Sequence, residues 1–372
     1  MLRSFEIKNF RCFRQLKVEH VERVNLIAGK NNVGKTAFLE ALFLLLGPDN
    51  PGLPMQLNPL RGVLWFEFVP DEAWGWIFTN RNTQETIELT GRDDGKRRRH
   101  LRIHLAEPQS SLLQVPGNGK NVPAKSFGAT TTAAGARELV LEYQDGSSAP
   151  TISRASIVLE GEQPKVKFQR GGGENLPLLE RPAMSRFPLG IFLTSAALHP
   201  PENPQRFSRL QEVGRESEVI ESLRILEPRL RRLVVSAWGP GIPVIQGDID
   251  IGRLVPIELM GGGVGKLLSC LLAIAEAQHG TVLLDEIENG LHHSVLPKVW
   301  AAIAEFARTF DTQVFATTHS LECIRAAHEA FSAGDKYDFA LHRLDRVEDE
   351  IRAVTYDREM LDAAIKADME IR

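Results

Sequence analysis

Cysteine is scarce in this sequence, and so are long apolar runs. The three cysteines, Cys12, Cys270 and Cys323, lie far apart and lack the spacing of metal ligands. A disulfide framework or a zinc cluster is therefore not expected, and a reducing, cytoplasmic setting is. The longest strongly apolar stretch, residues 41–46, is far shorter than the roughly 20 residues that cross a bilayer. No membrane association is predicted.

An excess of one charge is also missing. The 44 Lys and Arg residues nearly balance 48 Asp and Glu residues, for a formal net charge of −4. This excludes a globally basic nucleic-acid binder, so DNA could bind only at a local basic patch. Arg97, Arg98 and Arg99 form such a patch. The alternative for these arginines is a solvated hairpin or a contact for an acidic partner protein.

A phosphate-binding loop follows the first strongly apolar strand. Residues 24–28 lead directly into GKNNVGKT at 29–36, and the apolar residues after it fall on one face of a helix. This strand, loop and helix order is the context that the P-loop requires. Lys35 is expected to neutralise ATP phosphates and Thr36 to bind Mg²⁺. The residues expected to contact nucleotide are Gly29, Asn31, Asn32, Val33, Gly34, Lys35 and Thr36.

Two further polar groups come directly after apolar strands. Asp285 and Glu286 follow residues 281–284, and His319 follows residues 313–317. Alone, an acidic pair or a single histidine more often has a structural role. With a P-loop in the same chain, Asp285 suits the Mg²⁺ shell and Glu286 can orient or deprotonate the attacking water. His319, as a neutral imidazole, can hydrogen-bond the γ-phosphate. Glu286 and His319 are therefore the predicted catalytic residues.

A cluster of glycines opens another predicted helix. Gly261, Gly262 and Gly263 would leave free N–H groups at the helix N-terminus, where an anion can bind. The stretch superficially resembles a second phosphate loop, but Leu267 stands where Mg²⁺ needs a hydroxyl residue. A plain glycine hinge is the alternative interpretation.

The order of elements predicts an α/β fold in three parts. Alternating strands and helices late in the chain imply a parallel sheet, which with the P-loop would form a discontinuous ATPase core of residues 1–60 and 258–372. Residues 61–190 carry strand-like segments and are expected to form an antiparallel β subdomain, with a mobile loop at about 109–135. Apolar residues at near-helical spacing, broken at Pro228, predict a helical lobe within 191–257.

Together these motifs resemble the head of an ABC-type AAA ATPase of the SMC, RecF and OLD class. Lys8–Phe13, Asp285–His292 and Ala316–Ser320 resemble the OLD-like members most closely. The resemblance implies a dimer around ATP, in which the glycine cluster of one subunit caps nucleotide held by the other. Met260 and Gly263 depart from the signature, where Ser and Gln are usual. His292 and His293 would lie in a loop at the dimer interface; a metal site with Glu288 is the alternative.

The resemblance also implies what the protein controls. Nuclease members carry a C-terminal Toprim domain, and the 53 residues after His319 leave no room for one, so no intrinsic nuclease is expected. The paired acids Asp248 and Asp250 are interpreted as a turn. By analogy, a homodimer or higher homo-oligomer would control a separate effector, such as a nuclease, in antiphage defence or DNA transactions. A scaffold with little hydrolysis and a RecF-like DNA-repair clamp remain alternatives.

Overall fold

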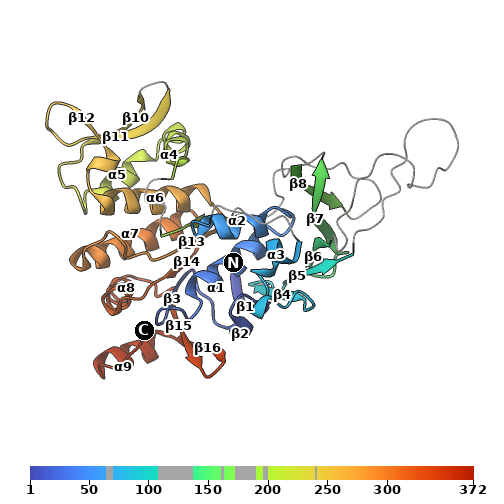
Figure 1. Ribbon diagram of the computed structural model, residues 1–372. Coiled ribbons are helices and arrows are strands. Elements are labelled where there is room, and N and C mark those ends of the chain that lie inside the picture. The colour runs from blue at the N-terminus through green and yellow to red at the C-terminus, as the bar shows by residue number, and fades with distance from the viewer. Residues whose placement is uncertain (64–69, 108–136, 161–162, 172–189, 196–199, 239–240) are drawn as a thin grey trace.

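The chain folds into two large sheets and a smaller lobe (Figure 1). The computed structural model describes residues 1–63, 70–107, 137–160, 163–171, 190–195, 200–238 and 241–372. The loop expected at 109–135 lies outside these ranges. In the part of the chain that is described, no helix combines the length and apolar character that a membrane span needs.

The core sheet is parallel apart from one edge strand. Its order is β16-β15-β3-β14-β13-β9, and β16 alone runs antiparallel to its neighbour. The strands are β3 Val24–Ala28, β9 Gly190–Leu193, β13 Thr281–Leu284, β14 Gln313–Thr317, β15 Phe339–Val347 and β16 Glu350–Tyr356. Every residue of β3, β13 and β14 is buried, because helices cover both faces of the sheet. The predicted strands at 24–28, 281–284 and 313–317 are confirmed with these bounds.

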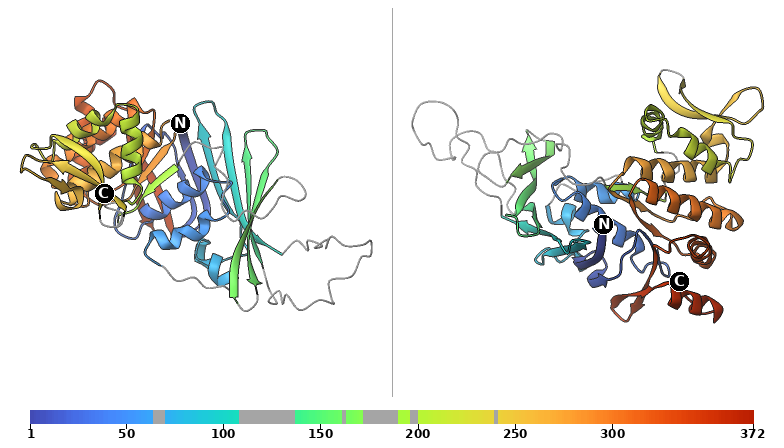
Figure 2. Two further views of the ribbon diagram at one scale, coloured as in Figure 1. Left: turned by 90° about the horizontal axis from the view of Figure 1, so that it is seen from above. Right: turned by 180° about the vertical axis from the view of Figure 1, so that it is seen from behind.

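Helix α1 (Lys35–Leu46) lies between the two large sheets (Figure 2). Nine of its 12 residues are buried, since both of its sides face a sheet. The Phe38 ring joins the two, with its centroid 5.5 Å from Phe5 in one sheet and 6.4 Å from Phe315 in the other. The remaining helices of the core lie on the other face of the parallel sheet or at its end: α6 Gly262–Glu276, α7 Leu296–Thr309, α8 Leu321–Ala333 and α9 Arg358–Lys366.

The second sheet is antiparallel, with the order β2-β1-β4-β5-β6-β7-β8. Its strands are β1 Leu2–Phe10, β2 Phe13–Val18, β4 Ile87–Asp93, β5 Arg98–Ala106, β6 Glu138–Asp145, β7 Thr151–Glu160 and β8 Gln163–Gly171. Short helices lead into it: α2 Leu53–Leu60, α3 Pro70–Gly75 and η1 Thr79–Arg81. Strands β1 and β2 precede the P-loop, so the antiparallel region is not confined to residues 61–190. Their alternating pattern predicts a strand, but not the sheet it joins.

The lobe mixes helices with strands, which corrects the expectation of a helical lobe. Helices α4 (Asn203–Glu212) and α5 (Glu216–Leu223) are followed by a three-stranded sheet. That sheet is β10 Arg232–Trp238, β11 Ile242–Asp248 and β12 Leu254–Pro256, and η2 Ile257–Leu259 follows it. Leu233 continues the helical spacing in sequence, but it lies in β10, where pairing with β11 overrides that pattern. Strand β9 belongs to the core sheet and not to the lobe.

Candidate active site

The polar residues that follow three core strands meet at one edge of the sheet. The P-loop follows β3, Asp285 follows β13, and Thr318 and His319 follow β14. Because these strands are parallel, their carboxyl ends lie at the same edge. Thr36 Oγ1 donates to Asp285, with both carboxylate oxygens at 3.1 Å, across 249 residues of sequence. The two predicted metal ligands are therefore in direct contact.

The P-loop wraps tightly around its own lysine. Lys35 Nζ donates to the carbonyl oxygens of Gly29 at 2.8 Å and Lys30 at 3.0 Å. Gly34 precedes α1 with φ +92°, and a Cβ there would meet Cys12 Sγ at 2.6 Å. Asn32 also has a left-handed backbone, with φ +67°. These turns place the loop at the start of α1, where backbone N–H groups and the helix dipole favour an anion.

Burial disfavours the ionised forms of two residues of the site, the buried Asp285 and the partly buried Lys35. Burial raises the pKa of Asp285, although hydrogen bonds from Thr317 and Thr36 act in the opposite direction. Burial likewise lowers the pKa of Lys35, while the nearby carboxylates of Glu286 and Glu288 oppose the shift. The residues fit a magnesium ion, because the Asp285 carboxylate and the Thr36 hydroxyl are the oxygen ligands that Mg²⁺ prefers. A cation there and phosphates beside Lys35 would relieve both charges.

Glu286 lies next to this pair in a strained conformation. Its φ is +47°, a left-handed backbone that residues other than glycine seldom adopt. The Glu286 N–H donates to Thr317 Oγ1 at 2.8 Å, and its Oε2 accepts from Asn289 Nδ2 at 2.7 Å. Thr317 Oγ1 also donates to Asp285 Oδ1 at 2.7 Å. One hydroxyl thus joins the carboxylate of Asp285 to the backbone of Glu286, while Asn289 holds the Glu286 carboxylate. Motif spacing alone does not reveal these roles of Thr317 and Asn289.

His319 is held by Glu288. Glu288 Oε1 accepts from Thr318 Oγ1 at 2.7 Å and from the His319 N–H at 2.9 Å, and His319 Nδ1 lies 3.3 Å away. The His319 side chain remains 48% exposed and can reach a ligand. Across the described residues no group of three or more His, Cys, Asp or Glu side chains is arranged to bind a metal, so the alternative that pairs Glu288 with His292 gains no support.

The glycine cluster packs against the loop that follows Glu286. Gly261 has φ +102°, and α6 begins at Gly262. A Cβ on Gly263 would lie 2.9 Å from the carbonyl oxygen of Gly290, so a side chain there would force the two loops apart. Cβ positions on Gly261 and Gly262 meet no atom within 4 Å. Gly263 therefore allows a close contact within the chain, while a side chain on Gly261 or Gly262 would point into open space.

Two family models match this chain. Residues 1–106 match one described as "AAA ATPase domain", and residues 83–325 match one described as "AAA domain, putative AbiEii toxin, Type IV TA system". The second match covers more than half of the chain. The chain belongs to this AAA family.

Relatives of this AAA ATPase agree with that assignment. A Helicobacter pylori protein named ATP/GTP phosphatase is 22% identical over 356 residues, with 90% of each chain covered. RecF, a DNA replication and repair protein of Clostridioides difficile, is 29% identical over 117 residues, or 32% of this chain and 29% of RecF.

The fold agrees with a solved SMC head. The structure of an SMC head bound to the winged-helix domain of ScpA superposes with a TM-score of 0.50 at 12% identity. It covers 96% of this chain and 98% of that one. The predicted fold class, an α/β fold with a P-loop ABC-type ATPase head, is confirmed.

A buried ion cluster beside the P-loop of this AAA ATPase was not predicted. Glu40 of α1 is fully buried and accepts from Arg61 Nε at 2.6 Å and Nη2 at 2.9 Å. Arg11 Nε lies 2.8 Å from the same carboxylate. Burial alone would lower the pKa of Arg61, but Glu40 raises it overall, and the Asp285 charge adds to this rise. The sequence signal is Glu40 itself, the one acidic residue of α1, which lies within its apolar stretch.

The basic patch of the AAA ATPase is partly neutralised. Arg97 Nη2 donates to Asp145 at 2.6 Å, and Arg99 lies 4.0 Å from Asp93. Arg98 lies opposite Arg92 in the pairing of β4 with β5. The ion pairs of Arg97 and Arg99 reduce the charge that these two arginines can offer to a nucleic acid.

Proposed function

We propose that this protein binds Mg²⁺-ATP at the carboxyl edge of its core sheet and hydrolyses it with Glu286 as the residue that orients the attacking water. One observation carries the proposal: Thr36 contacts Asp285, and Thr317 holds Asp285 and Glu286 together. Metal ligands and a candidate base thereby occupy one site beside a P-loop. Phosphoryl transfer needs positioning and charge neutralisation more than covalent chemistry, and this arrangement offers both.

Each residue has a distinct task in this proposal. The N–H groups of the P-loop and Lys35 would bind the β- and γ-phosphates, and Thr36 and Asp285 would hold Mg²⁺. Bound Mg²⁺ would neutralise charge on the phosphate oxygens. Glu286 accepts a proton from water or fixes its orientation, and His319 donates a hydrogen bond to the γ-phosphate.

We further infer that two heads close around ATP, with the glycine cluster of one capping the nucleotide of the other. Support comes from the open space around Gly261 and Gly262 at the N-terminus of α6. Leu259, two residues before the cluster, is 72% exposed and would be covered by a second subunit. Met260 replaces the usual Ser of the signature, so backbone donors would make the contact.

The biological role follows by analogy. An OLD-like ATPase located in the cytoplasm would use this cycle to control a separate effector in antiphage defence. The family description, which names a toxin and antitoxin system, agrees with a role in defence. The similarity to RecF favours a second candidate, a DNA-repair clamp. Neutralised Arg97 and Arg99 make that candidate weaker.

The test is phosphate release by wild type and by Glu286→Gln, with the mass in solution followed in Mg²⁺-ATP. Turnover should fall by about 100-fold or more, because the general base or water-orienting group is lost, and the variant should accumulate as an ATP-bound dimer. Lys35→Ala should not bind nucleotide. Glu305→Gln, an exposed carboxylate on α7, is the matched control and should behave as wild type.

The same experiment tests the role of Glu286 and the scaffold alternative, and a separate measurement of DNA binding tests the clamp. Undiminished turnover in Glu286→Gln would contradict the role assigned to Glu286. Assembly with nucleotide but no turnover in wild type would favour the scaffold. Salt-sensitive DNA binding that is lost when Arg97, Arg98 and Arg99 are neutralised would favour the clamp.

A further inference from the structure

A buried lysine connects helix α6 to the catalytic loop. Lys266 is 1% exposed, and its Nζ donates to the backbone carbonyl oxygen of Asp285 at 3.2 Å. Lysine is seldom fully buried, because its ammonium loses hydration that few contacts replace. Its neighbours in α6, Leu267 and Leu268, are buried apolar residues typical of a core helix. The cost of burying Lys266 calls for a function that an apolar residue could not supply.

The contact fixes one particular peptide group. The carbonyl held by Lys266 and the N–H held by Thr317 both belong to the peptide bond between Asp285 and Glu286. Rotation of that peptide would change the φ of Glu286, which is already in the left-handed region at +47°. Lys266 and Thr317 thus hold the peptide from both ends. The direction of the Glu286 carboxylate depends on these two hydrogen bonds.

The helix that carries Lys266 also carries the glycine cluster. Gly262, the first residue of α6, lies about 6 Å along the helix axis from Lys266, at a rise of about 1.5 Å per residue. Gly263 packs closely on Gly290, which lies in the loop after Glu286. A displacement of the start of α6 would therefore reach the catalytic loop by two routes, through the Gly290 contact and through Lys266.

We propose that Lys266 is a positioning residue that holds the Asp285–Glu286 peptide in its catalytic orientation and couples it to the start of α6. Engagement of Gly261–Gly263 with nucleotide in a second head would then set the geometry of the carboxylate in the first. Hydrolysis at each site would depend on occupancy of the other. This inference rests on the proposed function, because it needs Glu286 to act in hydrolysis.

The decisive variant is Lys266→Met, which keeps the length of the side chain and removes its charge and donors. We expect kcat to fall about tenfold or more, since misplacement of a catalytic group by about 1 Å can cost up to 100-fold. The KM for ATP should stay within about twofold, because the phosphate and metal ligands are untouched. The midpoint of thermal unfolding should not fall, because removal of a buried charge offsets the lost hydrogen bond. Sigmoidal dependence of the rate on ATP should disappear.

A control variant and a second measurement make the result specific to Lys266. Lys298→Met replaces an exposed lysine of the neighbouring helix α7 and should leave kcat and stability unchanged. The rate of amide hydrogen exchange over residues 285–290 shows how firmly this segment is held, and it can be measured without turnover. It should be faster in Lys266→Met than in wild type and unchanged in Lys298→Met.

The outcomes separate this inference from the function on which it rests. Wild-type turnover that needs Glu286, with kcat and exchange unaltered in Lys266→Met, would overturn the role of Lys266 and leave the ATPase proposal standing. A fall in kcat accompanied by a matching loss of thermal stability would also overturn it, since Lys266 would then be a structural brace. Absence of turnover in wild type would overturn both.

Discussion

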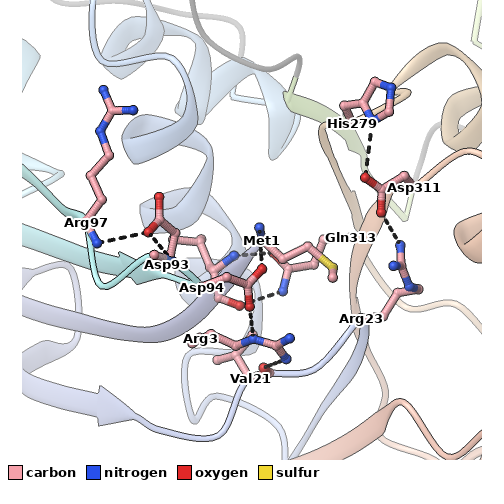
Figure 3. A network of polar contacts seen from close by, with 12 residues as sticks. Met1, Arg3, Val21, Arg23, Asp93, Asp94, Arg97, His279, Asp311 and Gln313 are labelled. Carbon is pink, nitrogen blue, oxygen red and sulfur yellow. Dashed lines mark hydrogen bonds and ion pairs between the residues drawn. The ribbon is translucent and has the colours of Figure 1, made fainter.

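The two edges of the core sheet differ in how far their charged side chains are buried. At the amino ends of the strands, Arg23 Nη1 donates to Asp311 at 3.0 Å and His279 Nδ1 lies 3.1 Å from the other carboxylate oxygen (Figure 3). Asp311 is 53% and His279 is 70% exposed. Gln313 of the same edge exchanges hydrogen bonds of 2.9 Å with both backbone groups of Leu2 and so ties β14 to β1.

At the carboxyl ends, by contrast, charges are buried and the backbone is strained. Asp285 and Lys266 are 6% and 1% exposed, and Glu286 has a left-handed backbone. The pKa shifts of Asp285 and Lys35 both show ionised forms that burial disfavours. The amino edge stabilises the fold with hydrated, paired groups. At the carboxyl edge, buried charges and a strained backbone lower the stability of the fold but leave ionised groups available to bind a ligand.

The sharpest test of this contrast is Asp285→Asn. Turnover should fall by about 100-fold or more, because the carboxylate that would hold Mg²⁺ is lost. The free protein should nevertheless become more stable at neutral pH, because a carboxyl whose pKa is raised by burial costs stability whenever it is ionised. Phosphate release and the midpoint of thermal unfolding without nucleotide measure the two effects. A lower midpoint would show that Asp285 stabilises the fold and would remove the contrast.

A smaller effect is expected at His342, a buried residue of β15 that pairs with Ile27 of β3. Burial, with a lesser contribution from the His20 charge, lowers the pKa of His342 to about 3. In the unfolded chain the pKa of His342 is about 6.5. Between pH 6.5 and pH 3 the unfolded state therefore binds a proton at this histidine that the folded state does not. The contribution of His342 to stability is full above pH 6.5 and is lost as the pH falls toward 3. At pH 5 the loss is about 2 kcal/mol.

Comparison with His342→Gln tests this pH dependence. Urea unfolding at pH 7 and pH 5 should show a smaller difference in the variant, because Gln does not titrate. Asn25 and Thr355, which contact the ring at 3.2 and 2.9 Å, keep a polar partner. Equal losses in both proteins would assign the acid sensitivity to other groups.

The smallest effect belongs to Arg23→Met. Arg23 is 17% exposed and also donates to the carbonyl oxygen of Ala307 at 3.1 Å, so its loss should cost about 1 kcal/mol of stability. Its kcat should match that of wild type, because nothing at this edge touches the nucleotide site. Urea unfolding and phosphate release test both statements. A fall in kcat would show that the two edges are coupled.

The sequence predicted the parts of the fold that depend on local pattern. Buried parallel strands appear as apolar runs, so residues 281–284 and 313–317 could be placed, and Asp285 and His319 could then be assigned to one edge. Leu233 was assigned to a helix because its spacing from Leu230 also fits one. Pairing of β10 with β11 makes this region a strand, and a hydrophobic pattern does not specify which strands pair.

The holding contacts of the site could not be predicted. Lys266 and Glu40 appear in the sequence as charges among apolar residues of their helices, and the sequence around them does not identify the groups that they contact. The left-handed backbone of Glu286 and the shared hydroxyl of Thr317 arise only when β13 and β14 lie side by side. Motifs identify the reacting groups, whereas tertiary packing fixes their orientation.

Strand β3 has a consequence for how the protein is made. It lies between β14 and β15 in the core sheet, and Asn25 bonds to Val314, which is 289 residues further along the chain. At an elongation rate of about 5–20 residues per second, a ribosome takes roughly 15–60 s to reach that partner. Throughout this interval an apolar strand and the phosphate loop behind it have no sheet to join. We therefore expect the nascent chain to depend on chaperones until synthesis has passed β15.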